Sequence, residues 1–137
     1  MNNKIRNALA VFGATVFVGM AHAMPSDFVG TWTNLNPSTR GIVKVVITPG
    51  LQIRNFGACT PTLCDMGAVN MITYGNNVSD LNHKYATAHY DMSFKKVEVI
   101  AKLTGNKIMT VEAFNRFIDG SGRQNYLSSE RFRKVAP

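Results

Sequence analysis

Apolar and polar residues alternate along short runs of this chain, and most runs end at glycine, proline or asparagine. Val97, Val99 and Ala101, for example, share one face of a run that ends at Thr104-Gly105-Asn106. Successive side chains of a β-strand point to opposite faces, so this alternation predicts strands. The predicted strands cover residues 28–33, 43–47, 51–54, 67–74, 84–90, 94–103, 108–117 and 126–135.

Short turns join these strands, and no segment carries the 3.6-residue apolar stripe of a helix over a helical length. Asp119-Gly120-Ser121-Gly122 is the strongest turn signal in the chain. Many short strands at regular spacing favour an antiparallel barrel or sandwich. Eight consecutive strands can close into a barrel, which removes the exposed sheet edges. We therefore predict an all-β fold, an antiparallel eight-stranded up-and-down barrel.

The N-terminus has the pattern of an export signal. Lys4 and Arg6 precede an uncharged stretch, residues 8–20, and Ala21-His22-Ala23 follows as a small-x-small site. This order is typical of a cleavable secretory signal, and the stretch is shorter than the roughly 20 apolar residues that span a bilayer. We expect a signal-peptide helix in residues 1–23, then a single β-barrel domain in residues 24–137, located in the periplasm or outside the cell.

Removal of the signal leaves a small basic chain. Lys4 and Arg6 would leave with it, so 13 basic residues would face 8 acidic ones, a net charge of +5. This balance favours an acidic macromolecule as partner, or simply a solvated basic surface. Export argues against nucleic acid. No second long apolar run follows, so we expect no transmembrane segment in the mature chain.

Cys59 and Cys64 are the two cysteines of the chain. In an oxidising compartment two nearby cysteines predict a disulfide, here one that holds the loop around Pro61. A redox pair would have two residues between its cysteines rather than four. A zinc site would need further ligands, for which His83 and His89 alone remain. We therefore expect a structural disulfide, no metal site and no cofactor.

The first predicted strand contains Gly30-Thr31-Trp32, and the last contains Arg131 and Arg133. A Gly-x-Trp in the first strand with a basic residue in the last resembles the calycin group of lipocalins, fatty-acid-binding proteins and avidins. The resemblance implies a lipocalin-like barrel in which Trp32 packs across the closed end. It also implies that Arg131 or Arg133 stacks on the indole ring through a cation–π contact.

A second resemblance covers most of the mature chain. It rests on residues 30–34, 39–42, 57–67 and 117–123, and on Phe132. These segments look like a family of small exported bacterial β-rich domains of uncharacterised function. The chain departs from that pattern at Met66 and Thr60, where tryptophan and histidine are usual. The resemblance implies a β-rich exported domain and no particular activity.

Several residues in these segments and turns are candidates for binding, although each also has a purely structural explanation. Asp65 lies beside the disulfide, and Asp119 and Arg123 flank a glycine turn, where turn chemistry alone accounts for the aspartate. His89 and Asp91 share a strand face but lack a nucleophile elbow, which argues against a hydrolase. The candidate binding residues are Trp32, Arg40, Asp65, Asp119, Arg123 and Arg131.

These observations favour a non-enzymatic binding protein whose ligand is a small apolar molecule or an acidic macromolecule. The alternative is a protein-interaction module, an inhibitor or assembly factor, that acts through a loop surface. The barrel interior distinguishes them, because small residues leave a cavity and a core filled with Phe, Tyr and Met does not. Trp32, Phe56 and Tyr74 are candidates to line that interior, but which face each occupies depends on the strand register, which the sequence does not give.

The signal predicts a defined N-terminus for the exported protein. Mass spectrometry of the exported fraction should find a chain of 114 residues that begins at Met24. A chain expressed without residues 1–23 supplies the reference mass. Recovery of the full 137 residues from that fraction would contradict the assignment.

Overall fold

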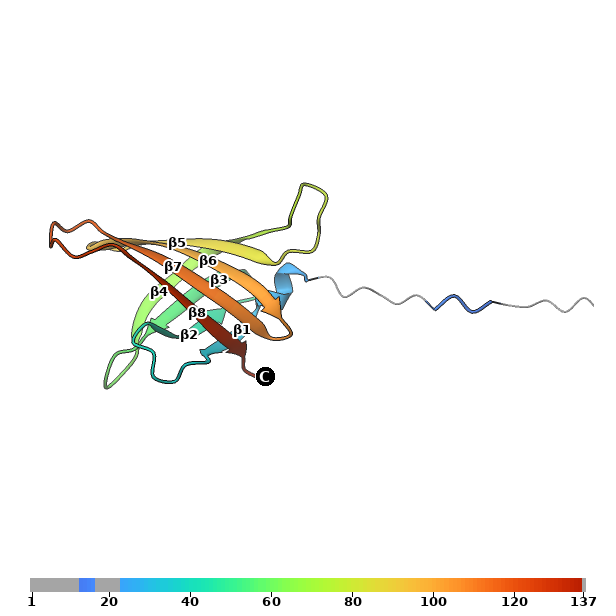
Figure 1. Cartoon of the computed structure of the whole chain (residues 1–137), viewed down its shortest axis with the longest axis horizontal. Helices are drawn as coiled ribbons and strands as arrows, with labels where there is room; N and C mark the ends of the chain where they lie inside the picture. The colour runs from blue at the N-terminus through green and yellow to red at the C-terminus, as the bar shows by residue number, and fades with distance from the viewer. Residues whose placement is uncertain (1–12, 17–22, 137) are drawn as a thin grey trace, which may run out of the picture.

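The computed structural model describes residues 13–16 and 23–136 and shows eight antiparallel strands closed into one barrel (Figure 1). Each strand pairs with the next along the chain, and β1 pairs with β8, so the predicted up-and-down barrel is confirmed. The strands are β1 (Gly30–Asn34), β2 (Ile42–Ile47), β3 (Gln52–Gly57), β4 (Cys64–Tyr74), β5 (Tyr85–Asp91), β6 (Lys95–Gly105), β7 (Ile108–Phe117) and β8 (Tyr126–Lys134).

The region before β1 differs from the prediction. Pro25–Phe28 forms a short 3-10 helix, η1, so Phe28 precedes the first strand rather than opening it. The predicted signal-peptide helix falls mainly on residues 1–12 and 17–22, which lie outside the described residues. Residues 13–16 have no regular secondary structure. Among the described residues, no helix is long and apolar enough to cross a membrane.

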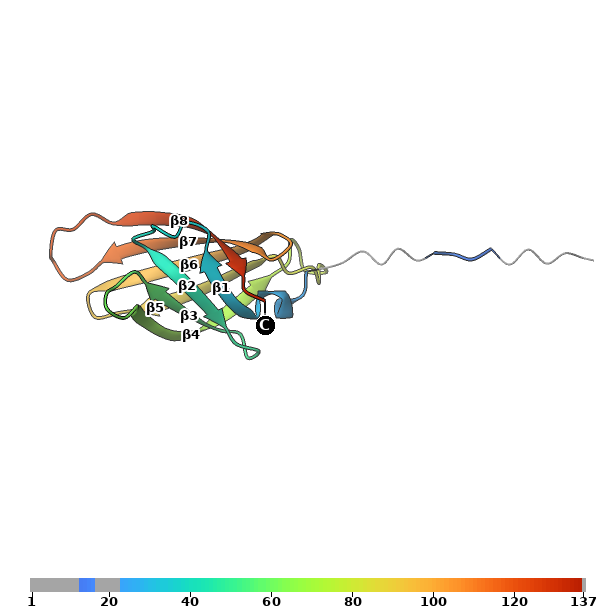
Figure 2. The ribbon, with the colours of Figure 1, turned by 90° about the horizontal axis from the view of Figure 1, so that it is seen from below.

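The connections gather at the two ends of the barrel. Residues 35–41, 58–63, 92–94 and 118–125 join the strands at one end, which we call the mouth. Helix η1 and the β2–β3, β4–β5 and β6–β7 connections lie at the other, which we call the closed end. The long β7–β8 connection extends furthest beyond the strands at the mouth (Figures 1 and 2).

Trp32 seals the closed end. Its ring is fully buried, and its indole N–H donates a hydrogen bond to the carbonyl of Phe28, 2.8 Å away. The ammonium of Lys134 lies 5.0 Å from the ring centroid and also donates to the carbonyl of Asp27. Partial burial lowers the pKa of Lys134, and Lys107 adds to this while Asp27 opposes it.

The cation over Trp32 is therefore Lys134 and not Arg131 or Arg133, as the calycin resemblance implied. The β1–β8 register places Lys134 directly opposite Trp32. Phe132 is fully buried in the barrel, and side chains alternate along a strand, so both arginines point outward and are exposed.

The interior is densely filled towards the closed end and lined by small residues on one side. Phe56 and Tyr74, two of the candidates for the interior, lie on the outer face. Lys44 stacks on the half-buried Phe56, and Tyr74 is 43% exposed. The bulky core residues are Phe28, Trp32, Val45, Ile47, Ile53, Met71, Tyr90, Val97, Val99, Met109, Val111 and Phe132, and the small ones on β5, β6 and β7 are Ala86, Ala88, Ala101 and Ala113.

Tyr90 ties β5 to β3 inside the barrel. Its hydroxyl donates a hydrogen bond to the carbonyl of Ile53, 2.9 Å away, and its side chain is almost wholly buried. Burial disfavours the phenolate, which raises the pKa of Tyr90 to about 12. The neutral form is thus favoured in the folded state.

The raised pKa predicts a loss of stability at alkaline pH. An unfolded tyrosine releases its proton near pH 10. The contribution of neutral Tyr90 to the free energy of unfolding is therefore fully present below that pH and is lost as pH rises towards 12. Urea unfolding at pH 9 and 11 should show the wild type losing about 1 kcal/mol more than Tyr90→Phe over this interval. Equal pH dependence of the two proteins would contradict this account.

Candidate functional site

A cavity of about 270 Å³ opens at the mouth of the barrel. Small side chains create the space. Gly41, Gly57 and Ala113 form parts of its wall, and a Cβ at Gly41 would lie 2.7 Å from Glu130 Oε1, so a side chain at position 41 would displace the Glu130 carboxylate. The full lining is Arg40, Gly41, Ile42, Gly57, Cys64, Met66, Met92, Phe94, Lys95, Val97, Ala113, Asn115, Tyr126 and Ser128.

Lys95, at the start of β6, is the cation set into the cavity wall. Its Nζ donates a hydrogen bond to Asn115 Oδ1 at 2.9 Å, and the buried Asn115 in turn donates to the carbonyl of Ala113. Burial lowers the pKa of Lys95, and the positive charge of Arg123 lowers it further. Within the described part of the chain, no carboxylate lies within ion-pair distance of this ammonium.

Arg123 adds a second cation near the rim. Its guanidinium lies 4.1 Å from the centroid of Phe117 and 5.6 Å from that of Phe94. Arg123 Nη2 also contacts Asp119 Oδ2 at 2.6 Å. The hydroxyl and amide of Ser121, together with Arg123, lower the pKa of Asp119 to about 2. The turn thus holds its arginine in place beside the mouth.

Glu130 is an acid close to the mouth, and both of its oxygens are already engaged. Oε1 accepts a hydrogen bond from the Thr39 hydroxyl at 2.6 Å, and Oε2 accepts one from the Asn34 side-chain amide. The Asn34 amide also donates to the carbonyl of Ile42. Glu130 therefore anchors the β1–β2 connection, and in the described chain it forms no ion pair with Lys95.

The structure brings some candidate residues together and separates others. Arg40 lines the cavity, and the Asp119–Arg123 pair lies at the same end of the barrel. Asp65 pairs with Arg54 at 3.5 Å and accepts the amide hydrogen of Gly67, so it stabilises the start of β4. The other two candidates, Trp32 and Arg131, lie at the closed end and on the outer face.

The sequence analysis missed Lys95 and Asn115. A signal for both was present, because Lys95 is two residues from Val97 and Asn115 is two from Ala113. Alternation along a strand places each pair on one face, and the apolar partners identify it as the inner face. Which strand ends meet at a shared cavity depends on closure and register, and the pattern of one strand does not contain that information.

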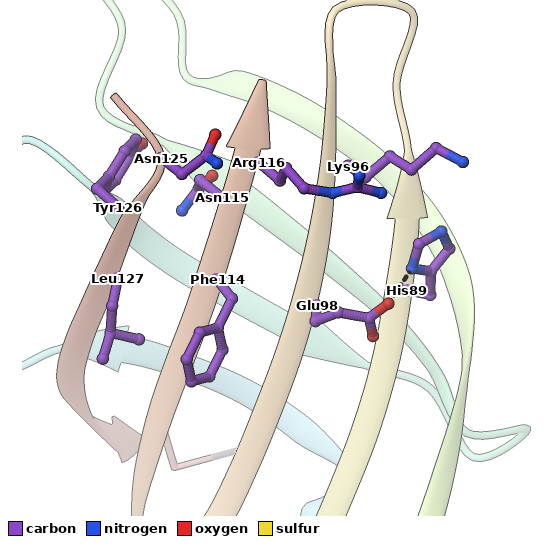
Figure 3. A pocket seen from close by; sticks show the side chains of 9 residues that line it. All are labelled: His89, Lys96, Glu98, Phe114, Asn115, Arg116, Asn125, Tyr126 and Leu127. Atoms are coloured by element: carbon purple, nitrogen blue, oxygen red, sulfur yellow. Dashed lines mark hydrogen bonds and ion pairs between the residues drawn. The ribbon is translucent and has the colours of Figure 1, made fainter. Parts of the chain in front are cut away.

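A second hollow, of about 460 Å³, lies on the outer face of β5–β8 (Figure 3). His89 Nδ1 contacts Glu98 Oε1 at 2.6 Å, whereas Asp91 pairs with Lys96, so His89 and Asp91 do not form a unit. We call this the outer groove. It is lined by His89, Lys96, Glu98, Phe114, Asn115, Arg116, Asn125, Tyr126 and Leu127.

The predicted disulfide between Cys59 and Cys64 is present. It closes the β3–β4 connection, and Cys64 lines the cavity. No set of three or more His, Cys, Asp and Glu side chains suited to a metal ion occurs in residues 13–16 and 23–136.

Comparison with protein-family models, curated proteins and solved structures finds no significant match to this chain. The site is therefore interpreted from its geometry and chemistry alone.

Replacing both Cys59 and Cys64 with serine should lower the free energy of unfolding by about 2 kcal/mol, as expected for a closed loop this short. The barrel should persist, because the eight-strand ladder does not run through the bridge. Circular dichroism and urea unfolding test both points, with the reduced wild type as the matched control. Loss of the β-sheet signal in the double variant would show that the bridge is required for folding.

Proposed function

We propose that this chain is an exported, non-enzymatic binding protein that takes up a small amphiphilic anion at the mouth of its barrel. In this proposal the acid group of the ligand contacts Lys95, and the apolar part of the ligand lies against Met66, Met92 and Val97. The observation that carries the proposal is the ammonium of Lys95, which is partly buried in an apolar wall with an amide as its partner and no carboxylate within ion-pair distance in the described chain.

The size of the cavity supports a small ligand. Binding pockets for small molecules measure about 300 to 1,000 Å³, and this cavity of about 270 Å³ lies just below that range. A water molecule takes about 30 Å³ in the liquid, so the space equals that of about nine waters. A short acyl or aromatic acid matches this volume better than a long-chain lipid.

The charges around the cavity support an anion over a neutral molecule. A half-buried ammonium is destabilised by lost solvation, and an opposite charge relieves that cost. Arg40 lines the same cavity, and Arg123 acts on Lys95 from nearby. A carboxylate placed at Lys95 would therefore have Arg40 as a second cation in the cavity lining, with Arg123, paired to Asp119, close by.

Export through residues 1–23 is part of the proposal. A periplasmic or extracellular location accords with a disulfide-bonded barrel, because disulfides persist in oxidising compartments. Membership of the family of small exported bacterial domains, and a closer kinship with lipocalins, belong to the proposal as well. The glycine and tryptophan of β1 and the cation over Trp32 support that kinship.

The outer groove supports a second candidate function, the docking of an acidic protein segment. Lys96 and Arg116 lie directly opposite each other in the β6–β7 register, and like charges in that position repel. Beside them Phe114 and Leu127 are 44% and 51% exposed. The carboxylates of an acidic segment would pair with Lys96 and Arg116, and its apolar side chains would cover Phe114 and Leu127.

The mouth site predicts selective binding of octanoate. In isothermal titration calorimetry octanoate should bind, whereas octanol should bind about tenfold more weakly or worse and octylamine not at all, because a charged hydrogen bond contributes about 1.5–3 kcal/mol. Lys95→Met should lose affinity for octanoate by a similar factor. Lys96→Met removes the neighbouring outward-facing charge and serves as the matched control.

Affinity for octanoate should also fall as pH rises through the pKa of Lys95, which lies below the 10.5 of an exposed lysine. The neutral amine no longer attracts the anion, so the wild type should show this decline and Lys95→Met should not. Equal effects of the Lys95 and Lys96 substitutions would refute the mouth site. Absence of octanoate binding by a folded wild type would refute the proposed function.

A further inference from the structure

Asn55 is a polar residue in the wall of a mainly apolar barrel. It lies on β3 between Ile53 and Gly57 on the inward face, and its exposed fraction is 0%. Neither its Oδ1 nor its Nδ2 has a hydrogen-bond partner within the part of the chain that the structure describes. Buried amides are nearly always hydrogen-bonded, so a wholly unpaired one needs an explanation.

Other polar side chains inside the barrel do have partners. The Tyr90 hydroxyl donates to Ile53, the Asn115 amide donates to Ala113, and Asn34 donates to Ile42 and Glu130. The contrast shows that this interior can satisfy polar groups where the fold requires them. An unpaired amide destabilises the free protein relative to an apolar side chain of the same size.

Asn55 does not line the mouth cavity itself, but it adjoins residues of β3 and β4 that do. Gly57, the next inward residue on β3, lines the cavity, as does its register partner on β4, Cys64. The β3–β4 register shifts between Arg54 and Phe56, and this leaves Met66 and Gly67 opposite Asn55. Met66 also lines the cavity and packs against the core. Asn55 therefore lies opposite, in the β3–β4 ladder, a residue whose side chain lines the cavity.

Met66 can give access to the amide. Its side chain is unbranched and has three rotatable bonds, so it adapts to the shape of its surroundings. The register shift opposite Asn55 is a β-bulge, a feature that re-aims side chains and is common beside functional sites. A ligand that enters past Lys95 and displaces the end of Met66 would reach the amide of Asn55 on the inward face of β3.

We infer that the ligand carries a second polar group, a hydroxyl or oxo group remote from its acid, which hydrogen-bonds to Asn55. The inference rests on the proposed function and specifies its ligand class as a short hydroxy or oxo acid. A primary amide both donates and accepts, so a hydroxyl can bond to either of its atoms. In this arrangement Lys95 binds the acid group of the ligand, and Asn55 binds the hydroxyl or oxo group of the same molecule.

Calorimetry with octanoate and a set of hydroxyoctanoates that differ in the position of the hydroxyl tests the inference. At least one hydroxy acid should bind the wild type about five- to tenfold more tightly than octanoate, the contribution of one hydrogen bond. Asn55→Leu should bind octanoate as the wild type does and show no such preference. Asn70→Leu, a change of the same type at an exposed position of β4, is the control.

One measurement on the wild type keeps the test decisive if Asn55→Leu folds poorly, and a second applies where the variant folds. The side-chain amide resonances of Asn55 in the wild type should shift with the preferred hydroxy acid and much less with octanoate. Where Asn55→Leu does fold, its urea midpoint should equal or exceed that of the wild type, because an unpaired buried amide has been removed.

The outcomes separate this inference from the proposed function. Binding of octanoate with no preference for any hydroxy acid, or a preference that persists in Asn55→Leu, would overturn the role of Asn55 and leave the mouth site in place. A lowered midpoint for Asn55→Leu would show that a bound water or another structural partner uses the amide. Failure of the wild type to bind any of these acids would overturn the proposed function as well.

Discussion

The pairing of β1 with β8 is the constraint on which the rest of the structure depends. It closes the eight-stranded sheet into a barrel, so that the inward-facing side chains are shielded from water by the strands on all sides. The same pairing sets Lys134 opposite Trp32, which bonds to the carbonyl of Phe28 in η1. One end of the barrel is sealed by these contacts, and access to the interior is left at the other.

The two halves of the interior are therefore chemically different. Towards the closed end the core is apolar, and its bulky side chains leave little space. Towards the mouth Arg40, Lys95 and Asn115 enter the lining, and glycines at 41 and 57 leave room. Lys95 and Asn55 both lower stability where they stand, one through burial of its charge and the other through its unpaired amide. Such local costs are typical of binding sites, where a ligand supplies what the folded chain lacks.

The fold was largely readable from the sequence, whereas the site was readable only in part. Val97, Val99 and Ala101 were assigned correctly to one face of a strand, and all three are buried. The faces of Phe56 and Tyr74 were left open because they depend on register, and the structure places both side chains outside. The cation over Trp32 was expected from the right strand but at the wrong residue, since inward alternation in β8 runs through Phe132 and Lys134. Lys95, the residue central to the proposed site, was not among the candidates.

The sequence by itself determined the local structure: the alternation that makes strands, the turns that end them, the disulfide and the order in which neighbours pair. These features depend on residues close together in the chain, and short-range physics decides them. The tertiary structure alone decided which strand ends surround a common space. Arg40, Lys95 and Asn115 meet there only because β8 closes on β1, and a residue pattern within one strand cannot encode the distance between side chains that closure brings together.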